Sequence, residues 1–131
     1  MKIEEIKHPE LKGHINMIYM HEENQNQSAI DKTESEIKEY IKDKEFIISI
    51  EDSKPVKIPY ANDGEYLVPI FTDVAEYLTG MDYFSLNDRA ENKEYEIVKL
   101  VNYKKLKEDP NFLGYIVNIA RVSYVIGTTL L

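Results

Sequence analysis

The sequence predicts a single α+β domain with a mixed, mainly antiparallel central sheet of about five or six strands and three or four short helices. Two observations support this fold class. Segments with helical periodicity alternate with β-branched and aromatic runs, and turn signals separate them. The 131 residues, 43% of them hydrophobic, also suit one domain rather than two. We therefore expect residues 1–131 to fold around one sheet.

Two helices are expected before the first strand. Apolar residues recur at helical spacing over residues 9–20, and Pro9 suits the first turn of a helix. The polar, aperiodic stretch HEENQNQS predicts a loop at residues 21–28. A second helix is predicted over residues 33–43, because Thr33 and Glu36 have the spacing of a capping box.

A strand is predicted at residues 46–50, where β-branched and aromatic residues are followed by acids. The runs VKIPY and YLVPIF flank ANDGE, whose Asp63-Gly64 step can supply a positive φ, so the two runs should pair as an antiparallel hairpin. Pro69 has no N–H group to donate. It should therefore face an edge, a bulge or the end of the strand, and mark where regular pairing stops.

A short helix is predicted directly after this hairpin, over residues 73–79. Thr72 or Asp73 can cap its start, Glu76 follows Asp73 by three positions, and Gly80 can take the left-handed position that closes a helix. The remaining predicted elements are strands at residues 83–86, 95–101, 114–119 and 122–127, and a turn of helix at residues 102–106.

Three segments carry a resemblance to a known family. YLVPIFTDVAEY is similar to the strand, proline, Phe-Thr and helix of the SseB family, YEIVKLVNYKKL to its strand followed by a short helix, and GYIVNIA to its Gly-Ile-Val-Ile-Asn-Pro strand. Ile119 stands where the family usually has the proline. Over residues 60–126 the chain thus resembles the N-terminal domain of SseB proteins, small bacterial α+β domains named for enhanced serine sensitivity. The resemblance implies a fold, and it brings no catalytic residues with it.

The charge of the chain argues against direct nucleic-acid binding. Sixteen basic and 24 acidic side chains give a net charge of −8, and the basic residues are interleaved with acids instead of forming a stripe that could neutralise phosphates. An acidity of this size either keeps a small domain soluble or attracts a basic partner.

Several features favour the cytoplasm. The chain has no cysteine, which excludes disulfides, thiolate metal sites and a cysteine nucleophile, and which fits a reducing compartment. The N-terminus MKIEEIKHPE has acids where a signal peptide needs an apolar core. The apolar C-terminal run contains Arg121 and Asn118, so we expect a buried pair of strands there rather than a membrane span.

The residue pattern predicts no catalytic, metal or cofactor site. His14 and His21 are seven positions apart, about 10 Å along a helix, so they cannot share one zinc. HEENQ lacks the second histidine of a zinc-protease motif, and His8 and the other two histidines are expected on the surface beside a loop. The acid pairs lack EF-hand spacing, and no nucleophile-elbow motif occurs.

Tyrosine provides the remaining functional signal, with ten Tyr and no Trp in the chain. Tyr combines apolar area with a polar group and is enriched at interfaces. Near the hairpin and the Gly80 turn, tyrosines alternate with acids. The predicted partner-binding residues are Tyr60, Asp63, Glu65, Asp82 and Tyr83.

The sequence therefore favours a small, acidic, SseB-like protein that acts as a non-enzymatic protein-interaction or regulatory module. An immunity or inhibitor protein that neutralises a basic toxin or nuclease is the alternative within the binding class. A metal-assisted hydrolase built on the acids and histidines is the enzyme alternative. The expected partner is a protein, with a basic one favoured by the charge, and the oligomeric state stays open.

Overall fold

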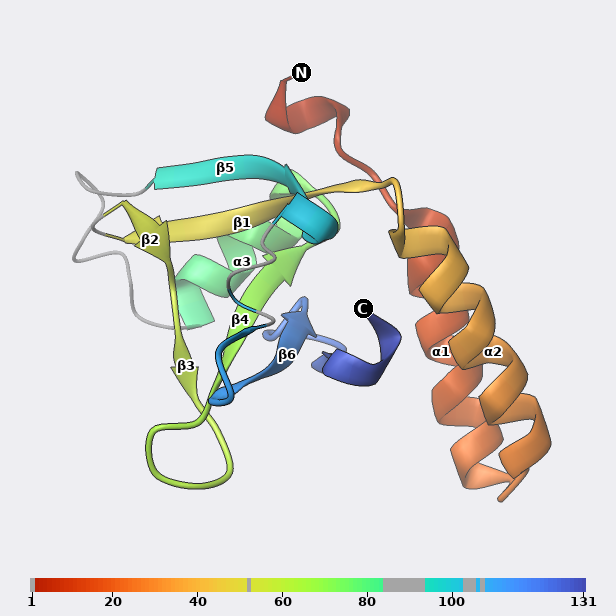
Figure 1. Ribbon diagram of the computed structural model, residues 1–131. Helices are drawn as coiled ribbons and strands as arrows, with labels where there is room; N and C mark the ends of the chain where they lie inside the picture. Colours follow the sequence, from red (N-terminus) through yellow and green to blue (C-terminus); the bar gives the residue numbers. More distant parts are fainter. Residues whose placement is uncertain (1, 52, 84–93, 103–105, 107) are drawn as a thin grey trace.

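The computed structural model describes residues 2–51, 53–83, 94–102, 106 and 108–131 (Figure 1). The described α-helices are α1 (Pro9–Glu23), α2 (Gln27–Ile41) and α3 (Val74–Tyr83). The strands are β1 (Glu45–Glu51), β2 (Lys54–Pro55), β3 (Ile58–Pro59), β4 (Tyr66–Phe71), β5 (Glu94–Lys99), β6 (Phe112–Val117) and β7 (Tyr124–Gly127). Short 3-10 turns are η1 (Ile3–Glu5), η3 (Leu100–Asn102) and η4 (Thr128–Leu130).

The seven strands found among the described residues belong to one sheet. Its order is β2-β1-β4-β6-β7, with β3 also pairing with β4 and β5 with β1. β4 and β6 run parallel, and the other pairs are antiparallel. The predicted α+β class with a mixed, mainly antiparallel sheet is therefore confirmed, with slightly more strands than expected.

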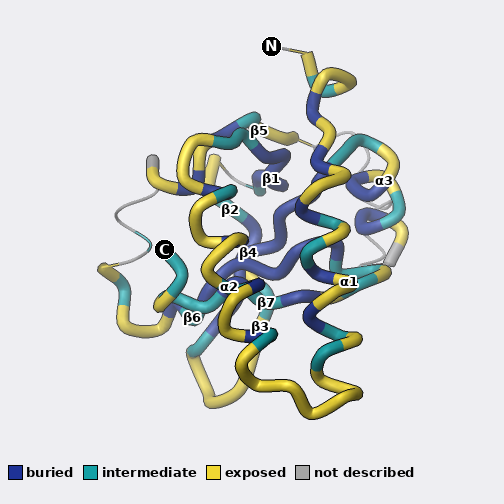
Figure 2. Tube along the Cα trace, turned by 90° about the vertical axis from the view of Figure 1, so that its right-hand side faces the viewer, coloured by how far each residue is buried: buried dark blue, intermediate teal, exposed yellow. Residues whose placement is uncertain are grey.

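Helices cover both faces of this sheet. Figure 1 shows α1 and α2 side by side and α3 away from them, and Figure 2 shows buried residues concentrated along β1 and β4. Ile48 of β1 packs in a large cluster with Leu11 and Ile37 of α1 and α2, whereas its neighbour Ile47 packs in a smaller cluster with Tyr77 of α3. Successive side chains of a strand point to opposite faces, so β1 contributes to both cores.

The first two helices differ from the prediction at the segment that joins them. Only residues 24–26 connect α1 to α2, so the loop predicted at residues 21–28 is present but shorter, and the helix predicted over residues 33–43 instead spans Gln27–Ile41. Asn26 is the N-cap of α2, since its side chain accepts a hydrogen bond from the N–H of Ala29 at 3.1 Å. Thr33 lies inside the helix and donates to the carbonyl of Ala29. Residues 22–28, at the end of α1 and the start of α2, are exposed, so this segment lacks the apolar periodicity that reveals a helix.

Pro69 lies within β4, where the strand changes its antiparallel partner. On one side of β4, residues 66–67 pair with β3 and residues 70–71 pair with β1. On the other side, the carbonyl of Ile70 accepts from the N–H of Asn118, beyond the end of β6. Backbone groups alternate along a strand, so Pro69 directs its nitrogen toward the gap between β3 and β1. The predicted interruption is thus present on that side, while pairing with β6 continues.

The helix after β4 begins as predicted and ends later. Asp73 caps it, because Asp73 Oδ1 accepts from the N–H of Glu76 at 3.0 Å. Gly80 lies inside α3 and does not close it, so that prediction is wrong. A Cβ at position 80 would approach Cε1 of Phe71 to 2.3 Å, and this contact between helix and sheet explains the glycine.

Two further predictions extend into residues that the structure does not describe. A strand at residues 83–86 is wrong at Tyr83, which belongs to α3, and residues 84–86 lie outside the described part of the chain. Residues 103–105 of the predicted helical turn also lie outside it. The two C-terminal strands are confirmed as the antiparallel pair β6 and β7. Within the described ranges, none of the helices has the length and apolar character needed to cross a bilayer.

Candidate partner-binding surface

An open groove of about 410 Å³ lies between the first turns of α1 and the last turn of α2. Four carboxylates line it, together with one histidine, one tyrosine and one lysine. These residues are Glu10, His14, Glu36, Glu39, Tyr40, Asp43 and Lys44, and we call the feature the acidic groove.

Helical spacing places these side chains together. Positions 36, 39, 40 and 43 share one face of α2 and its end, and positions 10 and 14 are one turn apart on α1. His14 bridges the helices, with Nδ1 at 3.4 Å from Glu36 Oε2 and Nε2 at 3.7 Å from Glu10 Oε1. Lys44 Nζ lies 5.3 Å from the centre of the Tyr40 ring. The groove is negative even with these basic groups included.

The wall of the groove is anchored from inside by His8. The Tyr40 hydroxyl lies 2.7 Å from His8 Nδ1, and His8 Nε2 contacts the carbonyl oxygen of Glu45 at the start of β1. The carbonyl can only accept, so Nε2 carries a proton, and in the neutral ring Nδ1 then accepts from Tyr40. The ring also stacks on Phe46 with 4.3 Å between centroids. Both nitrogens of His8 are therefore bonded inside the protein.

The burial of His8 corrects the prediction of a surface histidine. Its side chain is only 6% exposed, because the chain passes beneath the start of β1 at this point. Burial lowers the pKa of His8, and the nearby Lys44 ammonium lowers it further, against the opposing effects of the Glu45 carbonyl and the Asp73 carboxylate.

A second cavity, of about 360 Å³, is lined in part by His8. We call it the N-terminal cleft. It is lined by Glu4, Ile6, Lys7, His8, Pro9, Lys12, Asp73, Val74 and Ala75. His8 lines this cleft and Tyr40 lines the acidic groove, so their hydrogen bond connects the linings of the two cavities.

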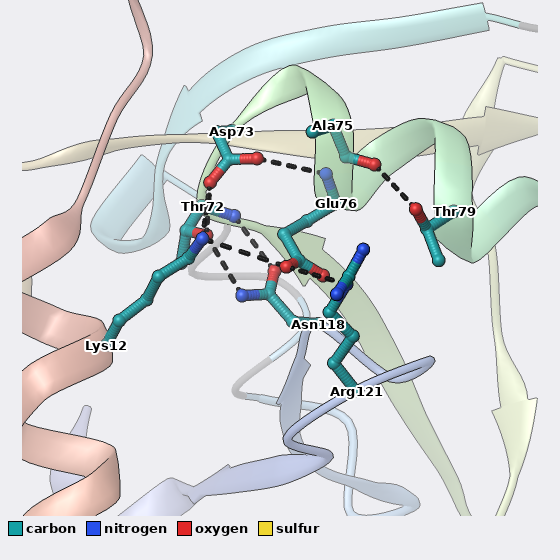
Figure 3. Close-up of polar contacts among 8 residues, drawn as sticks. All are labelled: Lys12, Thr72, Asp73, Ala75, Glu76, Thr79, Asn118 and Arg121. Carbon is teal, nitrogen blue, oxygen red and sulfur yellow. Dashed lines mark hydrogen bonds and ion pairs between the residues drawn. The ribbon is translucent and has the colours of Figure 1, made fainter.

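Polar groups gather where the parallel strands β4 and β6 end, a position where α/β proteins often bind ligands (Figure 3). Asn118 Oδ1 accepts from the N–H of Thr72 at 3.1 Å, and Asn118 Nδ2 donates to Thr72 Oγ1 at 2.9 Å. Thr72 in turn donates to Asp73, which also binds Lys12 at 2.8 Å. Burial raises the pKa of the Asp73 carboxyl, but the bonds from Lys12 and from the N–H of Glu76 outweigh it, and the pKa is lowered.

Glu76 joins three parts of the chain at this junction. Its Oε1 lies 3.1 Å from Arg121 Nε and 3.7 Å from Lys12 Nζ, while its Oε2 is buried without a hydrogen-bond partner among the described residues. Both acids at the start of α3 are thus bound to cations of the chain, and the cap prediction for Asp73 holds. The residues that the structure describes contain no group of three side chains suited to holding a metal ion.

The structure separates the predicted partner-binding residues. Tyr60, Asp63 and Glu65 lie together at the β3–β4 hairpin, where Tyr60 is 49% exposed and Glu65 Oε1 accepts from the N–H of Asn62. Asp82 and Tyr83 lie in the last turn of α3, away from the hairpin tip in both views (Figures 1 and 2). Asp82 is exposed, and the side chain of Tyr83 is outside the described part.

Sequence reasoning did not identify the acidic groove. The spacing of Glu36, Glu39, Tyr40 and Asp43 was a usable local signal, but which face of α2 stays exposed depends on its packing against α1. Comparison of the chain with family models, with curated proteins and with solved structures finds no match.

Proposed function

We propose that this chain is a non-enzymatic protein-interaction module that binds a basic partner through the acidic groove. The observation that carries the proposal is the convergence of four carboxylates from two helices on one open groove. The net charge of −8 supports it, because long-range attraction speeds the encounter with a basic partner. An SseB-like, regulatory role in the cytoplasm is part of the same proposal, supported by the three resembling segments and the absence of cysteine.

The groove suits arginine better than a simple cation. A guanidinium group can bind carboxylates through two parallel hydrogen bonds and can stack on flat aromatic rings. The groove offers both kinds of contact, with Glu36 and Glu10 beside His14 and the Tyr40 ring in its wall. A partner segment with arginine at its centre would therefore gain more than charge neutralisation.

Beyond the groove, the exposed face of α1 carries apolar side chains. Met17 and Met20 are 43% and 44% exposed, and Gly13 one turn before Met17 has open space around it. Methionine adapts its shape to apolar partners. The groove and these two side chains together suit a basic amphipathic segment, polar at one end and apolar at the other.

Titration calorimetry with a synthetic amphipathic peptide rich in Arg tests this proposal. The double substitution Glu36→Gln and Glu39→Gln should weaken binding about tenfold, at roughly 0.7 kcal/mol for each exposed ion pair, and should reduce its salt dependence. The matched control is Asp63→Asn with Glu65→Gln, which removes the same charge from the hairpin and should leave affinity nearly unchanged.

Other outcomes would contradict the proposal in distinguishable ways. Equal weakening by both double variants would mean that the net charge alone attracts the peptide. Weakening by the hairpin variant alone would place the binding surface at Tyr60, Asp63 and Glu65. No binding of the wild-type chain to the Arg-rich peptide, with binding to an acidic peptide of the same length, would reverse the proposed chemistry.

A further inference from the structure

The N-terminal residues cross from one core to the other around the end of the sheet. Ile6 packs in the small cluster beneath α3 and is 3% exposed, whereas Leu11 packs in the large cluster beneath α1 and α2. His8 lies between them and is bound to the carbonyl of Glu45. We call residues 2–8 the N-terminal strap, and His8 fixes it to the start of β1.

The buried position of His8 favours its neutral form. Nδ1 accepts the hydrogen bond of Tyr40, and Nε2 donates to the carbonyl of Glu45. An imidazolium has two donors and no acceptor, so on protonation the Tyr40 hydroxyl would have to turn from donor to acceptor, while the Glu45 carbonyl would still accept. Protonation would also place a charge on a side chain that is 6% exposed and stacked on Phe46.

The surroundings of His8 compensate for such a charge only in part, because the effects of burial and of Lys44 outweigh those of the Glu45 carbonyl and of Asp73. Lys44, just before β1, opposes the charge, and Asp73 at the start of α3 favours it. The Asp73 carboxylate is already bound to Lys12 at 2.8 Å. Tyr40 from α2 and the ring of Phe46 from β1 bring no negative charge at neutral pH. Glu4 and Lys7, which line the N-terminal cleft with His8, are exposed and of opposite charge.

We propose that His8 is a proton-operated latch: its protonation releases the N-terminal strap and frees the Tyr40 wall of the acidic groove. As regulation of that groove, the proposal rests on the proposed function, but the latch itself is a property of this chain alone. Acidification would open the N-terminal cleft and loosen one side of the groove at the same time.

The direction of the pH effect follows from the difference in the pKa of His8 between the released and the closed strap. In the released strap His8 is exposed and binds a proton below about pH 6.5, whereas in the closed strap burial lowers its pKa. The released state therefore binds more protons on acidification. Its population relative to the closed state should rise up to about tenfold for each pH unit below about 6.5, until the closed state is protonated too.

The absence of cysteine allows a direct test of strap release. A single spin label on Glu5→Cys, an exposed strap residue, should become more mobile as the pH falls from about 7.5 to about 5. In the unlabelled chain, the NMR signals of the Tyr40 ring should change with the same midpoint as those of the His8 ring. Neither measurement needs a bound peptide, so a failure of the proposed function would leave this test intact.

Three variants separate the latch from other titrations. His8→Gln keeps an N–H donor for the Glu45 carbonyl but cannot be protonated, so label mobility should lose its pH dependence. His21→Gln should leave the pH dependence of label mobility unchanged. His14→Gln should leave the pH response of the Tyr40 ring in place, although the ring centroids of His14 and Tyr40 are 6.5 Å apart.

The proposal is overturned if His8 titrates in the wild-type chain while the label stays immobile, a result that does not depend on any variant folding. It is also overturned if His8→Gln shows the same mobility change as the wild type. A strap that opens without any change at the Tyr40 ring would disprove the coupling to the groove.

Discussion

Asn118 holds Thr72 through two hydrogen bonds across the ends of the parallel strands, one to its backbone N–H and one to its hydroxyl. Asn118 is 1% exposed and has a φ of +49°, a left-handed conformation that Asn tolerates better than most residues. One side chain thus satisfies buried polar groups and also relieves a backbone constraint. These two contributions can be measured separately.

We expect Asn118→Ala to lower the free energy of unfolding by about 2–4 kcal/mol, because it removes two buried hydrogen bonds and places Ala at a positive φ. Asn118→Gly loses the same bonds without the backbone strain, so it should be less destabilised by about 1 kcal/mol. Urea denaturation of the three proteins gives both values. Equal stability of the Ala and Gly variants would show that the conformation at position 118 costs nothing.

Gly80→Ala should destabilise the chain by about 1–3 kcal/mol, because its methyl group would overlap the ring of Phe71. The matched control is Gly13→Ala in α1, where a Cβ has open space and Ala should stabilise by about 0.5–1 kcal/mol. Opposite signs for two identical substitutions inside helices are the expected result of thermal denaturation. A stabilising Gly80→Ala would mean that α3 can move away from the sheet at no cost.

The pH dependence of stability should contain a contribution from His8. Because burial lowers the pKa of His8 in the folded chain, its contribution is fully present above about pH 6.5 and is lost as the pH falls through the folded pKa. The slope attributable to this residue is at most about 1.4 kcal/mol per pH unit. Urea denaturation between pH 7.5 and 5 should show a shallower loss for His8→Gln than for the wild type, and parallel curves would contradict the assignment.

Tyr66 should ionise late in an alkaline titration. Burial, with the hydrogen bond to Asp109 at 2.7 Å and the charge of that carboxylate, raises the pKa of Tyr66 to about 12. The difference in tyrosinate absorbance between the wild type and Tyr66→Phe should therefore have its midpoint near 12, recorded while the far-UV circular dichroism is intact. Asp109→Asn should lower that midpoint but leave it above the ordinary value of about 10. A wild-type midpoint near 10 would contradict the buried position of the phenol.

Local chemistry predicted most elements of this fold, and non-local packing decided what it missed. Asp73 capped its helix as the spacing with Glu76 indicated, since both partners lie within one turn. Gly80 predicted the end of a helix, but the structure requires a glycine there because α3 packs closely against Phe71 of β4. Pro69 predicted a break in strand pairing. Only the sheet shows the cause, which is that β3 pairs with β4 before Pro69 and β1 pairs with β4 after it.

The candidate site was harder to predict for the same reason. Tyr60, Asp63 and Glu65 are neighbours in sequence and remain neighbours in the hairpin, whereas the acidic groove joins residues of two helices whose contact the sequence does not specify. His8 shows the limit most clearly. Nothing next to it in the chain indicates burial, and its partners Tyr40 and Glu45 lie 32 and 37 positions away.

The large core has a consequence for the protein during its synthesis. α1 and α2 can pair soon after they leave the ribosome, because they are adjacent in the chain. Their apolar face, however, is completed by Tyr115, Val117 and Ile126, and the hydroxyl of Tyr19 donates to the carbonyl of Val122, 103 positions later. Part of the apolar face of the paired helices therefore stays uncovered until β6 and β7 have been synthesised, and we expect this part to be exposed during translation.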